Sequence, residues 1–116
     1  MSTIDEVLSL MESTRVWFFS DLNDIAFRIE KTLNIDGVTG VVIFGSPTQI
    51  ILYYSDDRVL EPRYRMGLVP LISHELAHLI DPVDPERVVA ERLPKAMIQL
   101  WAKLREAGLA RCSMDA

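Results

Sequence analysis

The feature that most constrains this chain is an apolar run over residues 68–80 that contains the pattern H-E-x-x-H, in His74-Glu75-Leu76-Ala77-His78. The run is long enough for about three helical turns. Residues four apart lie above one another on a helix, so the imidazoles of His74 and His78 can reach one metal ion. Glu75 lies beside that face, where its carboxylate can hold a metal-bound water. Four apolar residues fall on roughly the opposite side: Leu68, Ile72, Leu76 and Leu79. We therefore expect a helix with one flank against a core and the other against a cleft.

A chance match is the alternative to a metal site, because the pattern fixes few identities and has a real false-positive rate. A lone histidine is more often a structural residue than a ligand. Here both histidines of the chain belong to the pattern. The pattern also falls within an expected helix whose apolar stripe is correctly placed. This context favours a metal site, with zinc as the expected ion.

The composition of the whole chain indicates one globular domain over residues 1–116, large enough for a hydrophobic core without a disulfide. The net charge of −5 argues against general binding to nucleic acid. Cys112 is the only cysteine, and residues 1–11 carry Asp5 and Glu6 rather than the positive charge of a secretory signal. No apolar run approaches the roughly 18 residues that span a bilayer. We expect a cytoplasmic protein that binds no membrane, and the oligomeric state stays open.

The first half of the chain reads as helix followed by a β-hairpin. Residues 3–33 keep helical spacing of their apolar positions, with a possible interruption at which Ser20 or Asp21 caps a second helix. The aromatic residues 17–19 are expected in a core or an interface. Residues 34–40 form a connector with Gly37 and Gly40 as turn signals. Residues 41–44 and 49–54 read as strands that pair antiparallel, and a short third strand near Val38 or at residues 58–60 is an open alternative.

The second half reads as two helices separated by a double break. The motif helix should end near Ile80, because Asp81-Pro82-Val83-Asp84-Pro85 disfavours helix. Asp84 should cap a new helix over residues 86–107 that bends at Pro94 and ends at Gly108, with residues 109–116 frayed. Its apolar stripe consists of Val89, Leu93, Met97, Leu100 and Leu104. The expected fold class is α+β: N-terminal helices, a small antiparallel sheet, the motif helix and a C-terminal helix.

A catalytic zinc usually takes three protein ligands, so the two histidines need a partner, and a carboxylate after the motif helix should supply it. Glu86 and Glu91 rank equally, ahead of Asp84. Glu86 lies at the end of an apolar stripe, where a carboxylate needs a partner, although a first-turn glutamate also favours the helix dipole. Glu91 is otherwise a solvent-exposed residue. Asp84 has the spacing of the aspartate in H-E-x-x-H-x-x-G-x-x-D, but Asp81 stands where that pattern has glycine. The simpler role of Asp84 is to cap the following helix.

The chemistry that follows from such a site is hydrolysis. Zinc lowers the pKa of a bound water from near 16 toward ~7, and Glu75 accepts its proton and passes it to the leaving amine. Residues 49–54 could hold an extended peptide by edge pairing. An oxyanion-stabilising tyrosine would be Tyr53, Tyr54 or Tyr64, although a buried or rim position is the usual one for tyrosine.

The chain resembles a minimal zincin metallopeptidase, and residues 50–94 are similar to the ImmA/IrrE-type gluzincins. The similar segments are Ile51 through Asp56-Asp57-Arg58, then Arg63-Tyr64-Arg65, the motif helix, and Ala90-Glu91-Arg92-Leu93-Pro94. Two features depart from that family, namely a short gap after His78 and a missing Glu-Ala-Asn signature. The resemblance implies a zincin-like fold, zinc, proteolysis and a regulatory protein target.

Two functions follow as expectations. The first is a zinc-dependent metallopeptidase acting on a peptide or protein, which the acid at Glu75 favours because structural zinc needs no acid there. The second is a non-catalytic zincin-fold module that binds or regulates a protein, which the small size of the chain favours.

Overall fold

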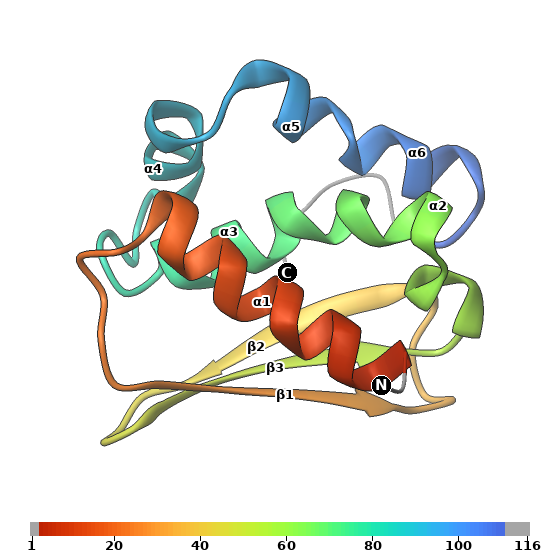
Figure 1. Ribbon diagram of the computed structural model, residues 1–116, viewed down its shortest axis with the longest axis horizontal. Coiled ribbons are helices and arrows are strands. Elements are labelled where there is room, and N and C mark those ends of the chain that lie inside the picture. The colour runs from red at the N-terminus through yellow and green to blue at the C-terminus, as the bar shows by residue number, and fades with distance from the viewer. Residues whose placement is uncertain (1–2, 111–116) are drawn as a thin grey trace.

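The computed structural model describes residues 3–110 and shows an α+β fold in which helices cover one face of a three-stranded sheet (Figure 1). Helix α1 (Thr3–Phe18) is followed by strands β1 (Ile25–Lys31), β2 (Val38–Ile43) and β3 (Thr48–Tyr54). Five further helices follow: α2 (Pro62–Arg65), α3 (Val69–Ala77), α4 (Pro85–Arg92), α5 (Lys95–Gln99) and α6 (Trp101–Glu106). The predicted α+β class is confirmed. Within residues 3–110, no helix combines the length and apolar character needed to cross a membrane.

The sheet is mixed rather than antiparallel throughout, with the strand order β1-β3-β2. Strands β2 and β3 pair antiparallel, as predicted for the hairpin, with Gly40 opposite Leu52. The predicted strand near Val38 is the beginning of β2 itself, and residues 58–60 lie in a 3-10 turn. The third strand is β1, which pairs parallel with β3. Strand β3 is therefore central and hydrogen-bonded on both sides.

The predicted helix over residues 3–33 is wrong beyond Phe18, and neither Ser20 nor Asp21 caps a second helix. Residues 25–31 form β1, in which Phe27 lies opposite Ile50 of β3. Apolar residues at positions 25, 27 and 29 alternate with other residues, which is the period of a strand. Asp24 turns the chain into that strand with a φ of 59°, a left-handed conformation that aspartate tolerates. Tertiary pairing with β3 therefore decides the structure of this segment.

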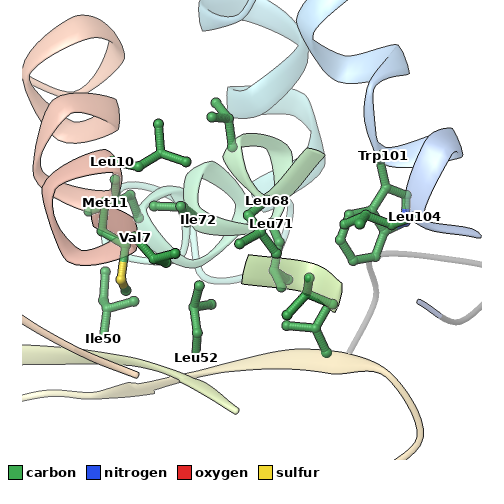
Figure 2. Close-up of a cluster of buried hydrophobic side chains, with 14 of the residues drawn as sticks. Val7, Leu10, Met11, Ile50, Leu52, Leu68, Leu71, Ile72, Trp101 and Leu104 are labelled. Atoms are coloured by element: carbon green, nitrogen blue, oxygen red, sulfur yellow. The ribbon is translucent and has the colours of Figure 1, made fainter. Parts of the chain in front are cut away.

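The core lies between the helices and the inner face of the sheet (Figure 2). Val7 and Met11 of α1 lie above Ile50 and Leu52 of β3, and α3 packs beside them. Trp101 and Leu104 of α6 close the far side of the same cluster. Phe19, from the predicted aromatic core segment, is also fully buried, whereas Trp17 is about half exposed at 54%. The core thus holds α3 in the centre of the molecule.

The predicted C-terminal helix is broken rather than bent. Asp84 caps α4 by accepting a hydrogen bond from the Arg87 amide at 3.3 Å, as predicted. Leu93, which precedes Pro94, adopts an extended conformation (φ −96°, ψ 142°), because a residue before proline avoids the helical region. The chain then continues as α5 and α6.

Helix α6 ends at Glu106, two residues before the predicted stop at Gly108, and the chain does not fray after that glycine. Gly108 has a φ of +74°, and the Leu109 amide donates to the Leu104 carbonyl at 2.8 Å. This is the pattern of a Schellman cap, and it buries Leu109 against the core. The rest of the predicted frayed tail, residues 111–116, lies outside the described residues.

Candidate metal centre

The motif helix α3 is buried on all sides, not on one flank alone. Each of its nine residues, 69–77, is buried, since α1, α4 and strand β2 all pack against it. Pro70 lies in its first turn, and the helix ends at Ala77, close to the predicted end near Ile80. A pocket beside the motif lies at the C-terminal end of the helix, where His78 is partly exposed. The expected cleft is therefore small and terminal rather than a groove along the helix.

His74, Glu75 and His78 form a cluster that could hold a metal ion. One ligand atom from each of the three residues lies within 4.8 Å of the others. The two imidazole rings are 4.8 Å apart between centroids and nearly perpendicular, at 85°. The His78 amide donates to the His74 carbonyl at 3.2 Å, which keeps the two residues one helical turn apart. Two imidazoles and a carboxylate are a donor set that suits zinc.

A pocket of about 290 Å³ opens beside the two histidines, and residues 82–86 form its other wall. The side chain of Asp81 shapes that wall by accepting hydrogen bonds from the amides of Val83 (3.1 Å) and Asp84 (3.0 Å). Arg87 donates to the other oxygen of Asp81 at 2.9 Å. Asp81 does not need the left-handed backbone of a turning glycine, because its φ is not positive. The short gap after His78 thus folds back onto the histidines.

The candidate third ligands fall into two groups. Glu86 and Asp84 both line the pocket with the histidines, although the carboxylate of Asp84 also serves as the cap of α4. Glu91 is exposed and forms an ion pair with Arg87 at 2.8 Å, and it is not among the residues that line this pocket. Pocket lining thus separates Glu86 and Asp84 from Glu91, while the ligand atoms that lie within 4.8 Å of one another come from His74, Glu75 and His78 and not from Glu86.

Glu75 belongs to the cluster but is not among the residues that line the pocket. It is 2% exposed, and among the described residues no hydrogen-bond partner reaches its buried Oε2. Burial raises the pKa of this carboxyl from 4.5 to about 7. A buried carboxylate without partners is unfavourable unless it is protonated or faces a cation. An ion held by the histidines would supply that opposite charge, so the residues present fit a divalent metal.

Gly40 is the residue of this site that sequence reasoning missed. It was expected as a turn signal, but it lies in the middle of β2, and a side chain there would touch the Glu75 carboxylate. A glycine within a run of strand-forming residues indicates a close approach by another group, and that signal was available in Val38-Thr39-Gly40-Val41-Val42. Gly37, the other expected turn residue, does have a positive φ of 86°.

The predicted oxyanion tyrosines lie elsewhere, since none of the three lines the pocket beside the histidines. Tyr54 is buried in the core and Tyr53 lies on the opposite face of the sheet, as alternation along a strand requires. Tyr64 lies on α2, with the Arg63 guanidinium 4.8 Å from its ring centre. Arg65 donates to the Leu60 carbonyl at 2.8 Å, so it serves the local fold.

Comparison of the chain with protein-family models, with curated proteins and with solved structures finds no match. The resemblance to the gluzincins therefore stands on the motif and its surroundings in this chain alone.

Proposed function

We propose that this protein is a zinc-dependent metallopeptidase in which Glu75 is the general base. The observation that carries the proposal is the cluster itself: two imidazoles within 4.8 Å of a buried carboxylate, beside a pocket. The zinc ligands are His74, His78 and Glu86. Glu86 follows Pro85 in the first turn of α4 and lines the pocket with both histidines. A zinc ion bound there would acidify water and polarise a peptide carbonyl.

The residues of the chain then account for the proton transfers. Glu75 takes a proton from the attacking water and later gives it to the leaving amine. Burial raises the pKa of the Glu75 carboxyl to about 7 in the metal-free protein, and the positive charge of a bound ion would lower it again, so that the carboxylate could accept a proton. The same burial excludes water from one side of the carboxylate, so few other water molecules compete with the attacking water for its hydrogen bonds.

A peptide substrate needs a strand edge, and the predicted edge at residues 49–54 is wrong because β3 is central in the sheet. Within residues 3–110, β2 pairs with β3 alone, so its other edge is open. Strand β2 also contacts α3 and carries Gly40 beside Glu75. An extended peptide that pairs with this edge by main-chain hydrogen bonds would run past the site.

A non-catalytic module that binds metal and a partner protein is the second candidate. The burial of Glu75 favours it, since a base at 2% exposure needs a route by which water arrives. The peptidase requires the histidines to bind zinc and Glu75 to act as a base, whereas the module requires a partner protein and no hydrolysis.

The test has two measurements. The first is zinc content by elemental analysis, with about one zinc per chain expected for the wild type and little for His74→Ala or His78→Ala. Glu86→Gln should weaken zinc binding by at least about 10- to 100-fold, the loss that even a residue hydrogen-bonded to a ligand causes. Glu91→Gln, a matched change on the same helix, should leave it unchanged. A wild type that binds no zinc would contradict the metallopeptidase.

The second measurement is hydrolysis of a random-sequence peptide mixture by the zinc-loaded protein, with products read by mass spectrometry. Glu75→Gln should keep its zinc and lose hydrolysis by at least about 100-fold. Zinc binding without any hydrolysis by the wild type would select the non-catalytic module instead.

A further inference from the structure

Strand β2 packs against the motif helix α3, and the strand residue that faces Glu75, Gly40, has no side chain. Gly40 lies opposite Leu52, whose side chain faces the core. Because side chains alternate along a strand, the missing side chain of Gly40 is on the inner face, toward α3. Val38 at the preceding inner position is buried, and Val42 at the next is half-buried against the core.

The space that a side chain would occupy at Gly40 is filled by Glu75. A Cβ atom placed on Gly40 would lie 2.5 Å from Cγ, 2.8 Å from Cδ and 3.1 Å from Oε2 of Glu75. These are the nearest atoms to that position, and all three belong to one side chain. A carbon–carbon contact at 2.5 Å is far inside van der Waals separation, near 3.5–4.0 Å. An alanine at position 40 would therefore have to displace the Glu75 carboxylate.

Neither the backbone of β2 nor that of α3 is free to move and so avoid that displacement. Strand β2 is paired along its length with β3, and α3 is buried at every residue. Glu75 is only 2% exposed, so its side chain has little room for another rotamer. His74 and His78 do not contribute the atoms nearest to Gly40, so a change at Gly40 acts on Glu75 before it acts on the histidines.

We propose that Gly40 is a positioning residue for Glu75: the bare backbone of β2 seats the carboxylate and fixes its direction toward the histidine pair. The inference rests on the proposed role of Glu75 as the base. It extends the site from the helices α3 and α4 to a strand, and it couples the edge proposed for substrate to the group proposed to move the proton. Gly40 itself touches neither the metal nor the reacting atoms.

The activity test compares Gly40→Ala with Gly45→Ala in zinc-loaded protein, using one peptide that the wild type cleaves. An added Cβ at Gly45 would meet only the Pro47 carbonyl, at an ordinary 3.5 Å, so Gly45→Ala is the matched control. Gly40→Ala should retain one zinc per chain and a KM within about twofold, with kcat at least about tenfold lower. Unchanged kcat in Gly40→Ala would overturn the proposal. A wild type without activity would instead contradict the proposed function.

The stability test separates displacement of Glu75 from general damage to the sheet. Gly40→Ala should lower the Tm of the wild type by about 4 °C or more. In a Glu75→Ala background, where all three contacting atoms are gone, the same change should lower the Tm by less than about 1 °C. Equal losses in the two backgrounds would show that Gly40→Ala acts on something other than Glu75, and would overturn the proposal even if that variant folds poorly.

Discussion

The burial of the Glu75 carboxyl makes the stability of the metal-free protein depend on pH. Its pKa is about 7 in the folded state and near 4.5 when exposed. The folded state therefore holds more protons between these values, and stability falls as pH rises through this window. This difference between the two pKa values corresponds to about 3 kcal/mol in the free energy of unfolding, and that stabilisation is fully lost above pH 7. In urea unfolding with a chelator, the stability of Glu75→Gln relative to the wild type should rise by up to that amount between pH 5 and pH 8.

Three other carboxylates titrate in a different pH range, so the comparison of the wild type with Glu75→Gln reports on Glu75. Hydrogen bonds from Arg92, Arg58 and Arg87 hold the pKa values of Asp21, Asp56 and Asp81 below their usual range. Their contribution to stability is present above pH 4 and is lost only in stronger acid. Parallel pH profiles for the wild type and Glu75→Gln between pH 5 and 8 would contradict an unpartnered, buried Glu75.

The three motif residues could be predicted as a cluster because helical geometry alone brings positions i and i+4 together. Other segments of the chain determine the rest of the site. Glu86 depends on the path of residues 81–85, which the side chain of Asp81 sets through two amide hydrogen bonds. Gly40 depends on the approach of a strand that is distant along the chain. Such contacts leave no periodic pattern, so the third ligand stayed open and Gly40 was not recognised.

Strand β1 shows why a pattern of apolar residues can mislead over an entire element. Positions 22, 25, 26, 29 and 33 are apolar and suit a helix, but 25, 27 and 29 suit a strand equally well. Strand β3 decides between the two, because its second edge needs a partner that supplies hydrogen bonds. The pairing of β2 with β3 could be predicted without a distant partner, since the two strands are neighbours in the chain.

The end of α6 depends on Gly108, whose φ of +74° is unfavourable for residues with a side chain. No atom lies within 4 Å of the position that a Cβ would take, so Gly108→Ala carries the conformational cost alone. We expect a loss of about 1 kcal/mol in the free energy of unfolding, measured by urea denaturation. Gly45→Ala, at a position where φ is not positive and the added Cβ would make an ordinary contact at 3.5 Å, should change stability by less than about 0.5 kcal/mol. Equal effects would show that Gly108 is not strained by substitution.

Arg92 joins parts of the chain that are more than seventy residues apart. Its guanidinium donates to Asp21 at 2.6 and 3.1 Å and to the Phe18 carbonyl at 3.3 Å, and it lies 5.0 Å from the centre of the Phe19 ring. It thereby ties α4, which carries Glu86, to the end of α1. We expect Arg92→Ala to destabilise the protein by about 1–2 kcal/mol, measured by urea denaturation.

An arginine that pairs only within its own turn is the control for this interaction. Arg58 is exposed and bonds Asp56, two residues away, at 2.9 Å. Such a pair contributes little to global stability, so Arg58→Ala should cost less than about 0.5 kcal/mol. Similar losses in the two variants would mean that the link between α1 and α4 adds nothing beyond an ordinary surface pair.

Zinc binding should stabilise the whole molecule, because the proposed ligands come from the end of α3, at His74 and His78, and from the start of α4, at Glu86. The ion binds the folded arrangement and not the separated segments, so it shifts unfolding by about 2.7 kcal/mol when free zinc is 100 times Kd. Thermal unfolding with and without a chelator should show a rise in Tm of several degrees for the wild type. His78→Ala should show none, while Glu91→Gln, whose carboxylate pairs with Arg87, should match the wild type. A rise in His78→Ala equal to that of the wild type would place the ion elsewhere and remove the basis for the peptidase proposal.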